Sequence, residues 1–545
     1  MSSYQPTYDA ESRTWHGATF HGVFNPEASL GQVIFDILNR SSDSIVQIDM
    51  DTGRSMTYAE FKMRMIRFVQ NLTRIGVQKG DVVALTNANS ENLAPLVCAL
   101  LCIGAPFNPL APSFNEDDMA NMMRTTKPKL VFCDANNYET VRSALKQMTD
   151  GPTPPIFVFE DSREDVRHAE ELLNETGEEH CYMPQYLGDS RKTLAAIVCS
   201  SGTTGGYKGV CISHAKFKQS EGAYTLAYPK KSPIQRTFFT FSGIYWISGI
   251  SMLLNFLIKG DVRLFTRNSF NEDQFFEAVE KYRAALVATP PAHGNAIVSH
   301  PRIKSIDLRS INIWILGGSM VPEDLRDSID ALLPNGRSLN TIASSECGLI
   351  ASDFQMRIPN VMGTLLPGVQ VRIVDEEGNR LGIGEQGELL VKPALPFCGY
   401  YGNDKATADA MDEDGYCRTG DIGIIDANGC LCLVDRQKDI FKYKGFHITP
   451  SELEGLIRKI DGVQDVSVVG VPDPTRVMNL PAALIVRKPD SVLNAETVHS
   501  IIDSQVSDFK RLRGGVHFAN ELPKTETGKV LRRKVVEIIQ MNYRR

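Results

Sequence analysis

The chain has 545 residues, of which 42% are hydrophobic and 23% charged, and its formal net charge is −7. The length suits about three or four domain-sized units, and the composition is that of a folded globular protein, which excludes a disulfide miniprotein and a largely disordered chain. The small excess of acidic residues gives no support to nucleic-acid binding. We therefore expect a multidomain globular protein without a nucleic-acid partner.

The eleven cysteines are scattered along the chain, and no Cys/His cluster has the spacing of a zinc site. This pattern favours reduced thiols in an intracellular protein. The first residues lack the basic and apolar segments of a secretory signal, and Tyr543-Arg544-Arg545 is not the Ser-Lys-Leu peroxisomal address. We therefore expect a cytoplasmic protein.

Short apolar runs alternate with helical patterns through much of the first 430 residues. The expected strands lie at 82–85, 130–134, 155–159, 194–198, 285–288 and 313–316. Strands that alternate with helices predict layers of α/β structure around a largely parallel sheet.

The uncharged run at 238–258 is long enough to cross a bilayer. Its hydroxyl, amide and glycine residues instead favour a short buried strand, a turn and a buried helix. A transmembrane span is therefore the less favoured interpretation.

The pattern changes near residue 365. Runs at 369–375, 388–391 and 429–434 predict a small antiparallel sheet or barrel. A charged segment follows, and the residues after it mix strands with helices. We place the domain boundary there, with a large N-terminal α/β domain at 1–434 and a small α+β C-terminal domain at 435–545.

A segment rich in glycine and hydroxyl residues follows the expected strand at 194–198. Residues 200–209 contain four glycines, four hydroxyl side chains and one lysine. Glycines let the backbone approach an anion, hydroxyls donate hydrogen bonds, and a lysine supplies a point charge. A flexible linker would explain the glycines but neither the lysine nor the flanking apolar strands. We favour a phosphate-binding loop made by Ser200, Ser201, Gly202, Thr203, Thr204, Gly205 and Lys208.

A second glycine motif has a different interpretation. Residues 382–387 match G-x-G-x-x-G, but the dinucleotide fingerprint requires a helix after the motif. Here the strand expected at 388–391 follows. We therefore interpret this segment as a surface turn.

Several further motifs follow the phosphate loop in a fixed order. They are Gly317-Gly318-Ser319, Ser345-Glu346, Tyr416-Cys417-Arg418-Thr419-Gly420-Asp421, Asp435-Arg436-Gln437-Lys438, Phe441-Lys442-Tyr443-Lys444-Gly445-Phe446 and Pro523-Lys524-Thr525-Glu526-Thr527-Gly528-Lys529. This ordered set resembles the adenylate-forming superfamily, which includes acyl-CoA synthetases, peptide-synthetase adenylation domains and insect luciferases. The segments 442–445 and 512–516 are most similar to the coumarate-ligase and luciferase branch.

The resemblance implies a reaction in two steps. A small carboxylic acid attacks the α-phosphate of ATP and gives an acyl-adenylate and pyrophosphate, and the thiol of coenzyme A then displaces AMP. ATP, Mg²⁺ and coenzyme A are the implied cofactors. A relative that has kept the fold but is weakened or inactive as a catalyst is the alternative.

The resemblance also implies roles for residues of the large domain. Lys208 would bind the β- and γ-phosphates, and Glu346 with Ser345 would hold Mg²⁺. Asp421 would accept hydrogen bonds from the ribose, with Arg436 nearby. The other implied nucleotide-binding residues are Gly317, Gly318, Ser319, Ile342, Ala343 and Ser344.

In this family the small domain moves relative to the large one. The resemblance therefore implies a role in this motion or in one of its two states for each of three lysines. By resemblance, Lys529 bridges the substrate carboxylate and the α-phosphate in the first step. Lys438 is the hinge about which the small domain then rotates. Lys442 lies on the face that serves thioester formation.

The sequence departs from the family pattern at several places, including Tyr207, which replaces the common proline or small residue before the loop lysine. Ile342 and Ala343 stand where the family has a tyrosine that stacks on adenine and a glycine, which predicts weaker ATP binding. Tyr245 and Trp246, with Gly249, replace the His-containing segment that lines the acyl pocket of luciferases. Light emission from luciferin is therefore disfavoured.

Overall fold

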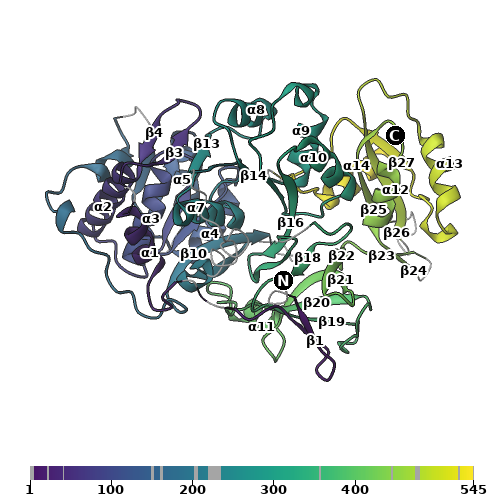
Figure 1. Ribbon diagram of the computed structural model, residues 1–545, viewed down its shortest axis with the longest axis horizontal. Helices are drawn as coiled ribbons and strands as arrows, with labels where there is room; N and C mark the ends of the chain where they lie inside the picture. The colour runs from purple at the N-terminus through teal and green to yellow at the C-terminus, as the bar shows by residue number, and fades with distance from the viewer. Residues whose placement is uncertain are drawn as a thin grey trace.

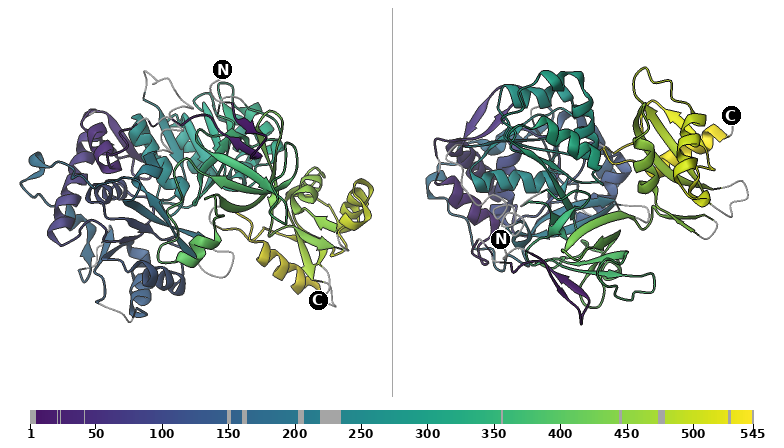
Figure 2. Two further views of the ribbon diagram at one scale, coloured as in Figure 1. Left: turned by 90° about the horizontal axis from the view of Figure 1, so that it is seen from below. Right: turned by 45° about the vertical axis from the view of Figure 1, so that its right-hand side comes forward.

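The computed structural model describes residues 5–20, 22, 24–40, 42–148, 152–159, 164–201, 207–218, 235–354, 357–443, 446–472, 479–525 and 528–543. A large body carries most of the chain, and a smaller body formed by the C-terminal elements packs beside it (Figures 1 and 2).

The first part of the large body is a seven-stranded sheet in the order β11-β10-β6-β5-β7-β8-β9. All neighbours are parallel except β10 and β11. The strands are β5 (Val83–Thr86), β6 (Phe107–Pro109), β7 (Leu130–Asp134), β8 (Ile156–Phe159), β9 (Arg167–His168), β10 (Leu194–Ser201) and β11 (Tyr207–Ser213). The associated helices are α1 (Leu30–Leu38), α2 (Tyr58–Arg74), α3 (Leu93–Ile103), α4 (Glu116–Thr126) and α5 (Tyr138–Lys146).

The second part is a sheet of fifteen described strands with a parallel and an antiparallel half. The parallel half contains β3 (Ile45–Asp49), β12 (Thr237–Thr240), β13 (Val262–Phe265), β14 (Leu286–Thr289), β15 (Ile313–Leu316) and β16 (Arg337–Ser344), with β4 (Ser55–Thr57) at its edge. Its helices are α7 (Ile247–Lys259), α8 (Glu272–Glu280), α9 (Pro291–Ser299) and α10 (Glu323–Leu332).

The antiparallel half begins at β16, which pairs in parallel with β15 and antiparallel with β17. One strand therefore joins the two halves of the sheet. The antiparallel strands are β1 (Thr7–Asp9), β2 (Thr14–His16), β17 (Gly348–Ser352), β18 (Gly363–Leu365), β19 (Gln370–Val374), β20 (Gly387–Lys392), β21 (Cys417–Ile425) and β22 (Cys430–Arg436), and α11 (Asp404–Asp409) lies between β20 and β21 in the chain.

The small body contains a three-stranded sheet, a hairpin and three helices. Its elements are β23 (Phe441–Tyr443), β24 (Phe446–Ile448), α12 (Pro450–Arg458), β25 (Val463–Pro472), β26 (Asn479–Arg487), α13 (Ala495–Gln505), β27 (Val516–Ala519) and α14 (Arg532–Tyr543). It has apolar clusters of its own on both faces of the three-stranded sheet. This separate core is what lets a domain move as a unit.

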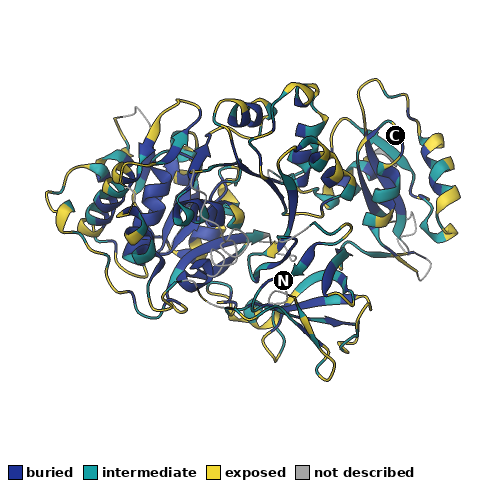
Figure 3. Ribbon diagram, viewed as in Figure 1, coloured by how far each residue is buried: buried dark blue, intermediate teal, exposed yellow. Residues whose placement is uncertain are grey.

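Burial explains the continuous apolar runs that predict the central strands. All four residues of β5, β14 and β15 are buried, as expected when helices cover both faces of a parallel sheet. Figure 3 shows this buried interior running through both sheets of the large body. In α2 the buried residues recur at helical spacing, so one face of the helix packs against the core and the opposite face is exposed.

The α/β architecture and the antiparallel region expected after residue 365 are both confirmed. The segment 382–387 is a turn followed by β20, so the dinucleotide interpretation is rightly rejected. Residues 238–258 form most of β12, a turn and most of α7; across the described residues, no helix meets the length and hydropathy needed to span a bilayer. The strand before the proposed domain boundary ends at Arg436, two residues beyond 434.

A buried ion pair holds β16 in place through contacts with Ser338 and Asn340. Arg326 on α10 is fully buried, and its guanidinium donates to the carboxylate of Asp353 and, at 3.3 Å, to Ser338 Oγ. The other carboxylate oxygen of Asp353 accepts the backbone N–H of Asn340 at 2.8 Å. Burial raises the pKa of Asp353, while the nearby Arg326 opposes this shift. The pair therefore connects α10 to the strand that joins the two half-sheets.

We predict that Arg326→Leu lowers the free energy of unfolding by about 3–5 kcal/mol, because it leaves the Asp353 carboxylate buried without its cation. Urea unfolding followed by tryptophan fluorescence measures the change, since Trp314 is buried on the neighbouring β15. Arg309→Leu is the matched control, because the pair of Arg309 with Asp307 is exposed and should contribute less than about 1 kcal/mol. Equal losses in the two variants would contradict this account of β16.

Candidate active site

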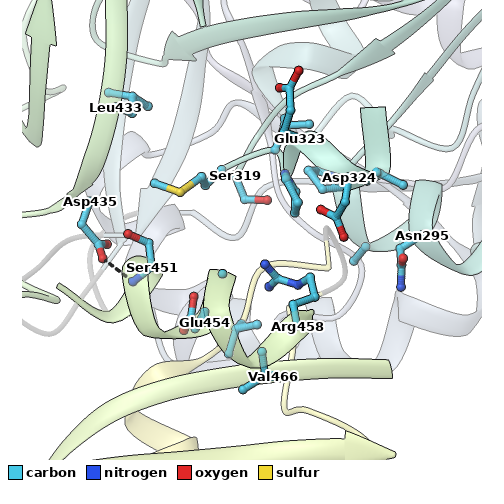
Figure 4. A pocket seen from close by; sticks show the side chains of 18 of the residues that line it. Asn295, Ser319, Glu323, Asp324, Leu433, Asp435, Ser451, Glu454, Arg458 and Val466 are labelled. Carbon is cyan, nitrogen blue, oxygen red and sulfur yellow. Dashed lines mark hydrogen bonds between the residues drawn. The ribbon is translucent and has the colours of Figure 1, made fainter. Parts of the chain in front are cut away.

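A cavity of about 820 Å³ lies between the large and small bodies. Its walls include the turn after β15, the end of β16, the paired strands β21 and β22, α12, and the segment that precedes α14. Figure 4 shows side chains of both bodies facing each other across it. The cavity brings together predicted residues that are far apart in the sequence, namely Gly318, Ser319, Ile342, Ala343, Asp421, Arg436 and Lys529.

The wall formed by β16 and the turn after β15 suits a flat base. Ile342 lines it with an apolar side chain that is 7% exposed. A Cβ on Gly317 would lie 2.7 Å from Thr341 Oγ1, so the close approach of the turn to β16 requires glycine. Gly318 has φ +87°, a conformation that favours glycine.

Asn340 is a residue of this wall that the sequence analysis missed. Its side chain is 2% exposed and lines the cavity, and its Oδ1 accepts no hydrogen bond within the described parts of the chain. A buried amide oxygen without a partner costs free energy, so it suits a ligand that donates an N–H, such as an adenine amine. The sequence signal that could have identified Asn340 is its position as a polar residue in an apolar strand, two residues before Ile342.

Asp421 and Arg436 face each other on paired strands. Arg436 Nε lies 2.6 Å from Asp421 Oδ1, and the aspartate side chain is 14% exposed. Burial raises the pKa of Asp421, and the positive charges of Arg436, Lys529 and Lys438 oppose this shift. The result is a carboxylate at the cavity wall that can accept hydrogen bonds from sugar hydroxyls.

Lys529 reaches this wall from the small body. Its turn is closed by hydrogen bonds from Thr525 N to Lys529 O and from Gly528 N to Thr525 O, both 2.8 Å. The Lys529 side chain is exposed at the mouth of the cavity. Partial burial lowers the pKa of its ammonium, as do the charges of Arg436 and Lys438. Lys529 therefore lines the same cavity as the Asp421–Arg436 pair.

The turn that carries Lys529 docks on α9 of the large body. Gly528 has φ +74°, and a Cβ at this position would lie 2.7 Å from the Cβ of Ala292. A residue with a side chain would be both strained and too close there. This glycine contact sets how far Lys529 enters the cavity.

The other end of the small body is tied to β22. Asp435 Oδ2 accepts the backbone N–H of Ser451 at 3.0 Å (Figure 4), and Ser451 Oγ donates to Val434 O at 2.7 Å. The predicted hinge residue Lys438 lies in the turn between β22 and β23. In this turn Asp439 N donates a hydrogen bond to Arg436 O at 2.9 Å. The chain therefore leaves the large body through a short turn.

A second group of predicted residues lies beyond the cavity. Lys208 is the second residue of β11 and lies opposite Ser200 on β10, so the two ends of the predicted phosphate loop are adjacent. Gly202, Thr203, Thr204 and Gly205 lie outside the described residues, as does the side chain of Ser201. Lys208 Nζ is 4.9 Å from the ring centroid of Tyr400, and Tyr400 Oη donates to Glu346 Oε1 at 2.9 Å. The structure thus connects Lys208 with Glu346 through Tyr400, which the sequence analysis missed.

The residues present fit a magnesium ion that is shared with a nucleotide. Within the described ranges there is no group of three or more His, Cys, Asp or Glu side chains arranged for a metal. Mg²⁺ at nucleotide sites is commonly held by one or two carboxylates together with substrate phosphates and water. The single carboxylate of Glu346, at the turn between β16 and β17 and across Tyr400 from Lys208, meets that requirement. Ser344 is the last residue of β16 and Ser345 the first of the turn, and Ser344 Oγ accepts a hydrogen bond from Cys347 N at 3.0 Å.

The predicted acyl-pocket residues lie at the start of α7. Trp246 is the residue before the helix, and the ring centroids of Tyr245 and Trp246 are 5.7 Å apart. Gly249 packs so tightly that a Cβ would lie 2.0 Å from Gly243 O. None of these three residues lines the cavity between the bodies. The structure therefore groups them with each other rather than with Asp421 and Lys529.

Lys442 is remote from the cavity in this arrangement. It lies opposite His447 in the hairpin of β23 and β24, where it is exposed to solvent. Figure 1 places this hairpin at the outer edge of the small body. Of the two lysines of the small body predicted to be catalytic, Lys529 and not Lys442 lines the cavity.

Comparisons with known proteins agree with these motifs. The family model described as AMP-binding enzyme matches residues 35–401, and the model of the AMP-binding enzyme C-terminal domain matches residues 452–529. The first alone covers more than half of the chain.

Two curated relatives are similar over nearly their whole length. Probable 4-coumarate–CoA ligase 1 of Dictyostelium discoideum is 26% identical, over 96% of this chain and 98% of the relative. Peroxisomal OPC-8:0-CoA ligase 1 of Arabidopsis thaliana is 28% identical, over 95% of this chain and 94% of the relative. The fold matches that of ATP-bound MatB from Rhodopseudomonas palustris with a TM-score of 0.81 at 24% identity, over 94% of this chain and 99% of MatB. The chain belongs to the AMP-binding family of adenylate-forming enzymes.

Proposed function

We propose that the protein is an acid–thiol ligase that activates a small carboxylic acid with ATP and transfers the acyl group to coenzyme A. The observation that carries this proposal is the cavity to which the small body contributes Lys529 and the large body Asn340, Asp421 and Arg436. Lys529 on the small body faces the proposed nucleotide site on the large body. Such a division suits a two-step reaction in which the two bodies adopt a different relative orientation for each step. The names of both curated relatives, which are CoA ligases, support the same class.

In the first step an anionic carboxylate must approach an anionic α-phosphate. Asn340 and Ile342 receive the adenine, and Asp421 accepts hydrogen bonds from the ribose. Lys529 then lies between the carboxylate and the α-phosphate, where its charge reduces their repulsion and stabilises the transition state. Lys208 neutralises the β- and γ-phosphates and so stabilises the departing pyrophosphate. Glu346 and Ser345 hold Mg²⁺, which supplies further positive charge to the phosphate oxygens.

In the second step the thiolate sulfur of coenzyme A attacks the acyl carbon, and AMP leaves. We infer that the small domain, predicted at 435–545, rotates about Lys438 relative to residues 1–434, while Asp435 and Arg436, which end β22, stay with the large body. The rotation withdraws Lys529 and brings Lys442 to the site. The exposed position of Lys442 on a hairpin leaves it available for this second arrangement. Tyr245, Trp246 and Gly249 shape the acyl pocket in this proposal.

A catalytically weakened relative is the second candidate. Ile342 and Ala343 favour it, because an aliphatic side chain covers the face of adenine less well than a ring does. The retained Lys208, Glu346, Asp421 and Lys529 argue for catalysis. A luciferin monooxygenase is disfavoured, since Trp246 stands where that activity has a histidine.

Acid-dependent exchange of labelled pyrophosphate into ATP tests the proposal. A panel of aryl, fatty and branched acids should contain at least one that supports exchange, and the same acid should give a CoA thioester when coenzyme A is added. Binding of ATP without exchange for any acid would favour the non-catalytic relative. Exchange without thioester formation would limit the proposal to its first step.

We predict that Lys529→Ala slows pyrophosphate exchange by about 10²–10³-fold, the scale for removing one group that stabilises charge in a transition state. Lys529 is exposed, so the thermal midpoint should change little. Lys534→Ala, an exposed lysine on the neighbouring α14, is the control. Undiminished exchange in Lys529→Ala would remove this residue from the first step.

Lys442→Ala should separate the two half-reactions. We expect pyrophosphate exchange to persist, while thioester formation from preformed acyl-adenylate and coenzyme A slows at least tenfold. Rapid-quench assays of each half-reaction measure the effect, and Lys488→Ala on the same domain is the control. Parallel losses in both half-reactions would show that Lys442 has no step-specific role.

Gly528→Ala should weaken the docking that places Lys529. The added Cβ would meet the Cβ of Ala292 at 2.7 Å, and alanine is strained at φ +74°. We predict slower pyrophosphate exchange and an unchanged rate of thioester formation from acyl-adenylate. Gly378→Ala matches the backbone strain at φ +87° but has open space around the new Cβ, so it should leave exchange unaffected. Equal slowing in both variants would assign the effect to strain in general.

A further inference from the structure

Tyr400 lies between the two charged groups assigned to the phosphate end of the site. Its hydroxyl donates to Glu346 Oε1 at 2.9 Å, and its ring lies 4.9 Å from Lys208 Nζ. Donation to a charged carboxylate is among the stronger side-chain hydrogen bonds. An ammonium within about 6 Å of an aromatic ring is attracted by the electrons of the ring face. Tyr400 therefore contacts both Glu346 and Lys208, the two residues assigned to the phosphate end of the site.

The backbone around Tyr400 is fixed to the strand that carries Lys208. Cys211 N donates to Gly399 O at 3.0 Å, Tyr401 N donates to Gly209 O at 2.8 Å, and Tyr400 forms a bridge with Val210. Tyr400 N also donates to Thr407 Oγ1 at 2.8 Å. The segment is thus attached to β11 through an isolated bridge and two flanking hydrogen bonds, which hold Tyr400 beside the strand that carries Lys208.

The backbone of Glu346 is held independently of Tyr400. Lys216 is 6% exposed, and its Nζ donates to the backbone carbonyl of Glu346. Its ammonium is thereby buried directly beneath the turn between β16 and β17. Loss of the Tyr400 hydroxyl should therefore change where the Glu346 carboxylate points and leave the turn in place.

We propose that Tyr400 is a positioning residue, which directs the Glu346 carboxylate to the magnesium ion of the nucleotide with its hydroxyl and places the Lys208 ammonium beside the phosphates with its ring. This inference rests on the proposed function for the identity of the ligand. Occupying one carboxylate oxygen with a hydrogen bond leaves Oε2 for the metal.

The two contacts can be separated by substitution. Tyr400→Phe keeps the ring and removes the hydroxyl, whereas Tyr400→Leu removes both. ATP binding measured by calorimetry, once in EDTA and once with saturating Mg²⁺, gives the gain in affinity due to the metal. This readout needs neither an acid nor coenzyme A, so it does not depend on turnover.

For Tyr400→Phe we expect the gain from Mg²⁺ to fall about tenfold, in line with the loss of a hydrogen bond to a charged group. ATP affinity in EDTA should stay at the wild-type value, because the ring under Lys208 remains. Tyr400→Leu should additionally weaken ATP binding in EDTA by about two- to fivefold. Tyr401→Phe, at the adjacent position, is the control and should behave as the wild type.

A double substitution tests whether Tyr400 acts through Glu346. Glu346→Gln should remove most of the gain from Mg²⁺, and adding Tyr400→Phe to it should cause no further loss. A wild-type gain in Tyr400→Phe, or an equal loss in the Glu346→Gln background, would overturn the proposal. Absence of acid-dependent exchange in the wild-type protein would overturn the proposed function instead, and the binding comparison would still decide the role of Tyr400.

Discussion

The contact of Gly528 with Ala292 on α9 places Lys529 at a cavity whose other walls belong to the large domain, and the proposed chemistry depends on that contact. Two anions cannot approach each other in a low-dielectric cleft without a cation between them. A lysine fixed permanently there would obstruct the thiol that must reach the same acyl carbon. A lysine on a body with a core of its own would meet both requirements if the whole body withdraws as proposed.

The large domain supplies a rigid counterpart to this movable lysine. β16 is shared by the parallel and antiparallel halves of the fifteen-stranded sheet, and it carries Asn340 and Ile342 toward the cavity. The turn that follows it presents Glu346. A buried Arg326–Asp353 pair and a buried Lys216 fix the strand and the turn from within. In the proposed function, segments of this one sheet therefore bind the base, the ribose and Mg²⁺, whereas Lys208, which binds the β- and γ-phosphates, lies on β11 of the seven-stranded sheet.

Much of the architecture could be predicted from the sequence, because buried strands such as 130–134 and 313–316 leave continuous apolar runs. The ordered motifs likewise identified Asp421, Arg436 and Lys529, which the structure does bring to one cavity. The interactions that position them were less visible. Tyr400 is an aromatic residue in a loop, and its role depends on Lys208 and Glu346, which are 192 and 54 positions away in the chain. No local pattern encodes such a contact.

The burial of Lys216 also could not be predicted from a local sequence pattern. A lysine three residues after a strand is typical of a solvated surface, yet this one is buried and bonded to a backbone carbonyl. The proposed acyl pocket is the converse case: Tyr245 and Trp246 contact each other, as expected for adjacent residues, but their residue types do not define an acid.

The central claim is that a carboxylate oxygen attacks the α-phosphorus of ATP in the cavity completed by Lys529. Transfer of ¹⁸O from a labelled carboxylic acid tests it most directly, with the products of one turnover analysed by mass spectrometry. The account predicts one ¹⁸O atom in AMP and none in pyrophosphate, because the bond formed in the first step joins the acid oxygen to the α-phosphorus. Label in inorganic phosphate, with ADP as the nucleotide product, would contradict it.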